Sequence, residues 1–192
     1  MDDTPGLGGR LQSIDEALTA PLTIRAAVRE DARISSGSRA AQAVALVMAH
    51  SGDSFIWGGL MVAAWLLGQH AWRVRAILGA VGLLVVEVVV IGLKMVFRRR
   101  RPPGDLGRLY RRADPYSFPS GHAARAAMLC ILCWKLGPPE VMAAVAIWSP
   151  LMVVSRIAIG IHYVFDVAAG IILGCAITAA LLAVVPFVAA RV

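Results

Sequence analysis

The sequence predicts an all-α membrane protein, a polytopic bundle of about six transmembrane helices with an N-terminal amphipathic helix at the interface. Of the 192 residues, 58% are hydrophobic, and the mean hydropathy of +0.71 is too apolar for an ordinary soluble domain. The apolar residues form separate stretches divided by short polar connections. Residues 1–38 contain no apolar segment with a cleavage site, so we expect no signal peptide.

We divide the chain into an N-terminal amphipathic segment, residues 1–37, and a membrane-embedded domain, residues 38–192. In the first segment, Leu11, Ile14 and Leu18 recur at helical spacing before Pro21 interrupts the pattern. A capping-box pattern at residues 13–16 predicts a helix start there. This helix either lies on the membrane surface or is a solvated N-terminal helix.

The first helices of the membrane domain are separated by polar residues. Residues 40–68 are apolar except for residues 50–54, which are polar and predict a turn, because unpaired polar groups are costly in hydrocarbon. Residues 69–75 form a polar connection. Residues 76–97 are long enough to cross a bilayer at about 1.5 Å per residue.

Two charged residues lie on this third helix. Glu87 and Lys94 are two turns apart on one face, which we expect to look into the bundle. The loop that follows, residues 97–118, contains prolines and glycines that exclude a continuous helix. Residues 98–100 are arginines, typical of a headgroup anchor or of a specificity element.

Three more helices are expected, over residues 120–136, 141–154 and 162–188. If the helices cross the membrane in alternating directions, four helix ends share one face of the membrane. These are the end of the third helix, the start of the fourth, the end of the fifth and the start of the sixth. Polar residues from three separate stretches can therefore converge there. They are Lys94, Arg101, Ser120, His122, Ser155, Arg156, His162 and Asp166.

The tetrapeptide Pro119-Ser120-Gly121-His122 opens the fourth helix. Ser120 is a good N-cap, and Gly121 leaves the backbone uncovered, so the first N–H groups of the helix can bind an anion. The tetrapeptide therefore favours a phosphate site. A capped helix with a surface histidine is the ordinary alternative.

His162 and Asp166 are four residues apart, so on a helix the carboxylate can accept a hydrogen bond from one imidazole nitrogen and leave the other more basic. This arrangement suits a nucleophile held by an orienting group. A pair that only pins a helix and a zinc site are the alternatives. Lys94, Arg101 and Arg156 would repel a dication but neutralise a phosphate, so we expect no metal.

The net charge of +7 comes almost wholly from arginine, since Lys94 and Lys135 are the only lysines. The expected partners are membrane lipids and a lipid phosphate substrate. Nucleic acid is disfavoured because the sequence contains no soluble basic domain. Cys130 and Cys133 have CxxC spacing within an apolar stretch, where small packing residues are a better interpretation than a redox or zinc pair.

Three motifs in this order resemble the signature of the type 2 phosphatidic acid phosphatase superfamily. They are Lys94, six residues, then Arg101-Pro102; Pro119-Ser120-Gly121-His122; and Ser155-Arg156, five residues, His162, three residues, Asp166. No signature position departs from the pattern. The hydrophobic layout resembles the six-helix membrane branch of the family over nearly the whole chain.

The resemblance implies a metal-independent phosphatase without a cofactor. His162 would attack phosphorus and form a phosphohistidine, Asp166 would hold its ring, and His122 would protonate the leaving oxygen and later activate water. The phosphoryl oxygens would be bound by Lys94, Arg101, Ser120, the backbone of Gly121 and Arg156.

Four accessory residues are expected near the site. For Glu87 we favour a paired packing carboxyl over a catalytic role. Arg125 would contact a headgroup or pair with Glu87 or Asp166, and we favour pairing. His50 and Asp53 fall on the same side as the site, where a simple polar turn is the favoured interpretation.

The expected function is hydrolysis of a phosphomonoester or pyrophosphate on a lipid, in a multi-pass protein of a bacterial plasma membrane. Phosphatidic acid, phosphatidylglycerophosphate, polyprenyl pyrophosphate and polyprenyl-linked sugar phosphates all fit a basic site beside lipid. A phosphotransferase with the same phosphohistidine and a non-catalytic anionic-lipid-binding protein are the alternatives. Arginines on both sides leave the orientation of the site open.

Overall fold

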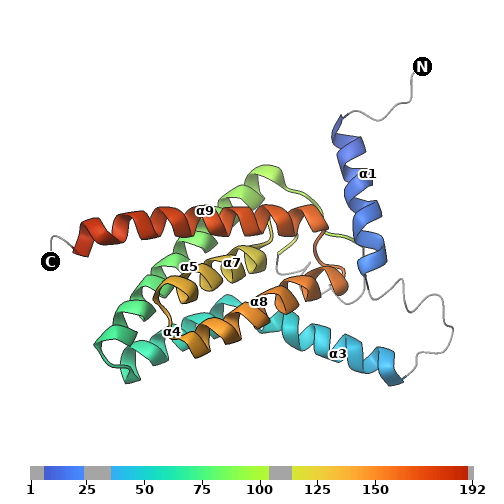
Figure 1. The fold of residues 1–192 in the computed structure, drawn as a ribbon. Helices are drawn as coiled ribbons and strands as arrows, with labels where there is room; N and C mark the ends of the chain where they lie inside the picture. Colours follow the sequence, from blue (N-terminus) through green and yellow to red (C-terminus); the bar gives the residue numbers. More distant parts are fainter. Residues whose placement is uncertain (1–6, 24–35, 104–113, 190–192) are drawn as a thin grey trace, which may run out of the picture.

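The computed structural model describes residues 7–23, 36–103 and 114–189, which form an assembly of helices (Figure 1). Within these ranges the regular elements are helical and one isolated bridge pairs Arg100 with Tyr116, which confirms the predicted all-α class. The elements are α1 Leu7–Thr19, η1 Ala20–Leu22, α3 Ser36–His50, α4 Ser54–Leu67, α5 His70–Phe97, α7 Gly121–Leu136, α8 Pro139–Ala158 and α9 Val164–Ala189.

Three of the described helices are long and apolar enough to cross a membrane: α5, α8 and the Val164–Val184 part of α9. The expected number was six. The difference lies in short helices, since α4 has 14 residues and rises about 21 Å, less than the hydrocarbon thickness of about 30 Å. The apolar part of α3 is shorter still, and α7 has 16 residues. The long apolar helices identify a membrane protein.

Most helix positions agree with the prediction, including the turn between α3 and α4. The start of α5 does not, because this helix begins at His70 and includes residues that we assigned to a connection. The helix contains Arg73 and Arg75 because their side chains bind backbone carbonyls outside it. Nε of Arg73 donates to the carbonyl of Gly68, and Nε of Arg75 donates to the carbonyl of Leu136. Similarly, α8 extends beyond the predicted 141–154 at both ends.

The N-terminal helix also starts earlier than its capping-box pattern indicates. α1 begins at Leu7, and Ser13 donates from Oγ to the carbonyl of Arg10 inside the helix, so the predicted start at residue 13 is wrong. The break predicted from Pro21 is confirmed, since α1 ends at Thr19 and a 3₁₀ turn follows. Of residues 1–37, those at 1–6 and 24–35 lie outside the described residues.

The closest helix packing joins α7 to α9. A Cβ on Gly170 or Gly174 of α9 would overlap the backbone carbonyls of Ser120 and Ala124 of α7, so only glycine permits this approach. The backbone N–H of Ser120 also donates to the carbonyl of Asp166 at 2.9 Å. These contacts hold the first turn of α7 against the first turn of α9.

A tight turn connects α8 to α9 at the same end of the bundle. Gly160 has a φ of +68°, a left-handed conformation that glycine adopts without strain, and its N–H donates to the carbonyl of Ile157. This turn places His162 between the two helices. α1 lies across this end of the bundle, beside the start of α9 (Figure 1).

Candidate active site

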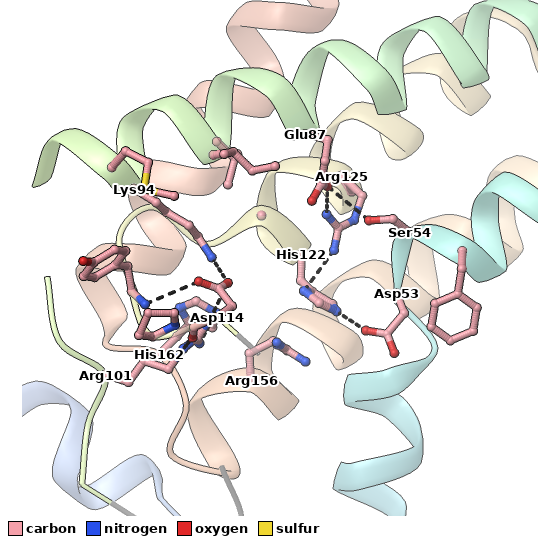
Figure 2. Close-up of a pocket in the computed structure, with 17 residues that line it drawn as sticks. Asp53, Ser54, Glu87, Lys94, Arg101, Asp114, His122, Arg125, Arg156 and His162 are labelled. Atoms are coloured by element: carbon pink, nitrogen blue, oxygen red, sulfur yellow. Dashed lines mark hydrogen bonds and ion pairs between the residues drawn. The ribbon is translucent and has the colours of Figure 1, made fainter. Parts of the chain in front are cut away.

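A pocket of about 680 Å³ lies where α4, α5, α7, α8 and the turn before α9 meet (Figure 2). Its wall brings together residues from all three stretches that the sequence singled out. These are Lys94, Arg101, Gly121, His122, Arg156 and His162. Ser120, Ser155 and Asp166 are buried at the same end of the bundle.

His162 is almost wholly buried and faces a charged group on each side. Its Nε2 lies 3.2 Å from Nη1 of Arg101, and its Nδ1 lies 3.6 Å from Oδ2 of Asp166. Because a guanidinium only donates, Nε2 is the acceptor and the ring proton lies on Nδ1, toward the carboxylate. Burial, with the charges of Arg101 and Arg156, lowers the pKa of His162 to about 3 against the opposing effect of Asp166. The ring is therefore neutral, with a lone pair on Nε2.

Asp166 is held in place by two other donors. Its Oδ2 accepts from the backbone N–H of Tyr163 at 2.9 Å, and its Oδ1 accepts from Nη1 of Arg99 at 2.7 Å. The carboxylate is fully buried, so its negative charge depends on these partners. The sequence predicts a headgroup anchor or a specificity element at Arg99 and its neighbours, but the side chain of Arg99 turns inward to buried carboxylates.

Asp114 lies between two of the expected phosphate-binding cations. Its carboxylate pairs with Lys94 and accepts from Nη2 of Arg101 at 2.8 Å (Figure 2). Burial alone would raise the pKa of Asp114, but the hydrogen bond and charge of Lys94, with the charge of Arg101, hold it below its usual range. An ionised carboxylate thus occupies the position where a phosphoryl oxygen is expected. The sequence offered no sign of this role, because Asp114 stands in an arginine-rich loop without a motif.

His122 contacts a carboxylate and a guanidinium. Its Nε2 lies 2.8 Å from Oδ1 of Asp53, and its Nδ1 lies 3.0 Å from Nη2 of Arg125 (Figure 2). Because Arg125 can only donate, Nδ1 is the acceptor and the ring proton is on Nε2, directed at Asp53. Gly52 makes this close approach possible, since a Cβ there would lie 2.9 Å from the imidazole ring.

The accessory residues divide into two groups. Glu87 accepts from Nη1 of Arg125 at 2.7 Å and from Ser54 at 3.1 Å, so the favoured pairing of Glu87 with Arg125 is confirmed. Asp53 lines the pocket and contacts His122, which is more than the simple polar turn we expected. His50 is half exposed, lies 3.0 Å from Asp53 and does not line the pocket.

The remaining expected anion-binding residues lie at the start of α7 and the end of α8. Ser120 caps α7 by accepting from the N–H of Ala123, as expected of an N-cap. Arg156 is almost wholly buried and donates from Nη1 to the carbonyl of Ala49 at 3.1 Å. Lys94, Arg101 and Arg156 thus give one end of the pocket a positive charge suited to phosphate.

Another part of the wall is apolar. It is formed by Phe55 of α4 and by Val90, Ile91 and Met95 of α5. A polar phosphate and an apolar chain could therefore occupy the same pocket. Among the described residues, no group of three His, Cys, Asp or Glu side chains is arranged to hold a metal ion.

The comparisons with known proteins find related sequences and similar folds. Residues 74–189 match the PAP2 superfamily. The chain is 30% identical to decaprenylphosphoryl-5-phosphoribose phosphatase of Mycobacterium tuberculosis, with 58% of this chain and 71% of the relative covered. It is 28% identical to the phosphatase of the same name from Mycolicibacterium smegmatis, with 78% of each covered.

Two solved protein structures share the fold. A PAP2-type phosphatidylglycerolphosphate phosphatase from Bacillus subtilis superposes with a TM-score of 0.69 at 23% identity, over 91% of this chain and 85% of the other. LpxE from Aquifex aeolicus superposes with a TM-score of 0.62 at 18% identity, over 89% of this chain and 93% of the other. At these identities the likeness concerns the fold.

Proposed function

The chain belongs to the PAP2 superfamily, and from that premise we propose that it is an integral membrane phosphatase that hydrolyses a lipid phosphomonoester through a phosphohistidine on His162. One observation carries the proposal. The neutral Nε2 of His162 lies beside Arg101 in a pocket that His122 also lines. A nucleophile, an anion-binding cation and a proton carrier are thus gathered around a space large enough for a phosphate.

In the first step, the lone pair on Nε2 of His162 attacks phosphorus, and the bond from phosphorus to the leaving oxygen breaks. Lys94, Arg101 and Arg156 stabilise the charge that builds on the phosphoryl oxygens. Asp166 stabilises the ring, which becomes positively charged while Nδ1 keeps its proton. Phosphate must displace Asp114 from Lys94 and Arg101 in order to bind.

His122 supplies the proton that the leaving oxygen needs. The acid form of its ring carries protons on both nitrogens, whereas here Nδ1 accepts from Arg125. Protonation from solvent would therefore accompany phosphate binding, with Arg125 turning Nη2 away and keeping its bond to Glu87. Asp53 stabilises the charged ring.

In the second step, water attacks the phosphohistidine. His122, now neutral, accepts a proton from the water, and the bond between Nε2 of His162 and phosphorus breaks. Inorganic phosphate leaves, His122 releases the proton it accepted to solvent, and both histidines return to their neutral starting state. No metal or cofactor takes part in this scheme.

A lipid-linked substrate fits the pocket because its apolar wall adjoins the cationic end. The two mycobacterial relatives are named for a polyprenyl-linked phosphoribose, which makes this compound the first candidate. A multi-pass position in a bacterial plasma membrane, with six helices in or across the bilayer, would leave the headgroup at the surface and the chain in lipid. The exposed Leu11, Ile14 and Leu18 of α1 would then lie at the interface.

The experiment measures phosphate release by the purified protein in detergent and chelator. The substrates are decaprenylphosphoryl-5-phosphoribose, phosphatidic acid, phosphatidylglycerophosphate and a polyprenyl pyrophosphate. Wild type should release phosphate from at least one of them, and His162→Ala should retain about a thousandth or less of the rate. Glu140→Gln, exposed at the other end of α8, serves as the control and should match wild type. Equal rates in wild type and His162→Ala would refute the mechanism, and transfer to an added lipid alcohol would identify a phosphotransferase.

A further inference from the structure

α1 packs on the bundle by its polar side rather than its apolar side. Leu11, Ile14 and Leu18 are each about half exposed, whereas Asp15 and Thr19, one turn apart, are buried. An amphipathic helix that only anchored the chain would have no reason to bury a carboxylate, since burying a charge is costly unless it is paired. The buried aspartate therefore points to a specific partner.

Asp15 and Thr19 cap the start of α9. Oδ1 of Asp15 accepts from the backbone N–H of Phe165 at 3.0 Å, and Oγ1 of Thr19 accepts from that of Val164 at 3.1 Å. The first N–H groups of a helix have no partner within it and usually take one from a residue just before it. In this chain, a helix about 150 residues earlier supplies the acceptors. α1 thus fixes the turn of α9 that carries Asp166.

Arg99 connects the same aspartate to the reacting pair. Its Nη2 lies 2.7 Å from Oδ2 of Asp15, and its Nη1 lies 2.7 Å from Oδ1 of Asp166. Its guanidinium carbon is also 4.1 Å from the centre of the Tyr163 ring. One guanidinium therefore spans two fully buried carboxylates, and the planar fork of arginine suits this better than lysine.

The division of Arg99 between two carboxylates leaves one oxygen of Asp166 for the active site. Without Asp15, both donors of the guanidinium could bind Asp166, because arginine and carboxylate prefer a bidentate pairing. Because Asp15 binds one side of the guanidinium, Arg99 reaches only Oδ1 of Asp166. Oδ2 of Asp166 therefore accepts from the N–H of Tyr163 and faces Nδ1 of His162. The position of the ring therefore depends on a residue in the N-terminal helix.

We propose that Asp15 and Arg99 are positioning residues for the His162–Asp166 pair, so that α1 is part of the catalytic apparatus. This inference rests on the proposed role of His162 as the nucleophile. Neither residue lines the pocket or reaches the phosphate. Their loss should reduce the rate of the chemical step much more than substrate binding.

The test compares Asp15→Asn and Arg99→Lys with two matched controls, Glu16→Gln and Arg10→Lys, at exposed positions of α1. Asp15→Asn keeps an oxygen that can cap α9. Arg99→Lys keeps the positive charge but loses the planar guanidinium that binds two carboxylates at once. For a lipid phosphate that wild type hydrolyses, both variants should lower kcat about 10- to 100-fold, the range for groups that orient a reacting residue, and change KM by less than about threefold. The controls should match wild type.

A second measurement does not depend on turnover. ¹⁵N spectra of the His162 ring in the folded full-length protein should shift at Nδ1 in Asp15→Asn and not in Glu16→Gln, because the facing carboxylate moves. An unchanged His162 spectrum, or a kcat within about twofold of wild type in folded Asp15→Asn, would overturn the inference. If wild type hydrolyses no lipid phosphate, the proposed function fails, and the spectra still decide whether α1 positions the ring.

Discussion

Arg101 donates from Nη1 to Nε2 of His162 across 3.2 Å, and this contact determines which nitrogen of the ring carries the proton. Since Nε2 must be the acceptor, the proton lies on Nδ1, on the side of Asp166. The same contact keeps the reactive nitrogen next to a cation that can bind a phosphoryl oxygen. Arg101 therefore sets the tautomer of the nucleophile and also supplies a positive charge beside it.

The protonation state of His162 is the first prediction. Its pKa of about 3, lowered chiefly by burial, implies a neutral ring with the proton on Nδ1 from pH 8 to pH 5. In the unfolded chain the imidazole of His162 takes up a second proton near pH 6.5, whereas in the folded protein it stays neutral to about pH 3. The free energy of unfolding is therefore not reduced by this group above pH 6.5, and it declines as pH falls toward 3. ¹⁵N spectra recorded across this pH range should show no titration, and added phosphate should raise the pKa. Titration of the free protein near pH 6.5 would contradict the geometry.

Asp114 should compete with phosphate. Its carboxylate pairs with Lys94 and Arg101, so Asp114→Asn should free both cations and strengthen inhibition by inorganic phosphate about three- to tenfold, as expected for a partly exposed charge. Inhibition constants measured for the variant, wild type and the Glu140→Gln control test this. Weaker inhibition in Asp114→Asn would mean that the carboxylate orients the two cations instead of blocking them.

Asp53 should support the acid form of His122. Asp53→Asn removes the carboxylate 2.8 Å from Nε2, so kcat should fall about 10- to 100-fold and the alkaline limb of its pH profile should move to lower pH. His50→Gln is the control, because that ring contacts Asp53 but does not line the pocket. An alkaline limb that stays in place in Asp53→Asn would exclude this role.

The contact between α7 and α9 should be intolerant of any side chain at Gly174. A Cβ there overlaps the carbonyl of Ala124, so Gly174→Ala should cost about 1–3 kcal/mol of unfolding free energy and reduce activity. Gly92→Ala in α5 is the matched control, because a Cβ at that helical position meets no atom within 4 Å. Thermal unfolding in detergent compares the two. Equal midpoints would show that the helices can separate without loss.

Much of the pocket could be predicted from the sequence because its residues stand at helix ends. Lys94, Gly121, His122 and His162 lie next to apolar stretches, and alternation of these stretches brings the ends together. The start of α5 could not be predicted from hydropathy, since its first turns are polar and pair with nearby carbonyls.

The contacts of Asp15, Arg99 and Asp114 could not be predicted at all. The ion pairs of Arg99 with Asp15 and Asp166 join segments far apart in the sequence, and Asp114 reaches Arg101 across a loop. No motif or spacing in the sequence links the two partners of any of these pairs. Asp15 in particular reads as part of the polar face of a surface helix. Only the folded arrangement shows that this face is turned toward α9.

The central claim is that His162 carries the phosphoryl group, and trapping that group tests it most directly. With p-nitrophenyl phosphate, whose leaving group needs no proton, His122→Ala should form the phosphohistidine but hydrolyse it slowly. After a quench in base, peptide mass spectrometry should find phosphate on His162 in this variant and none when His162→Ala is added. Phosphate on another residue, or equal release by both variants without any labelled histidine, would contradict the account.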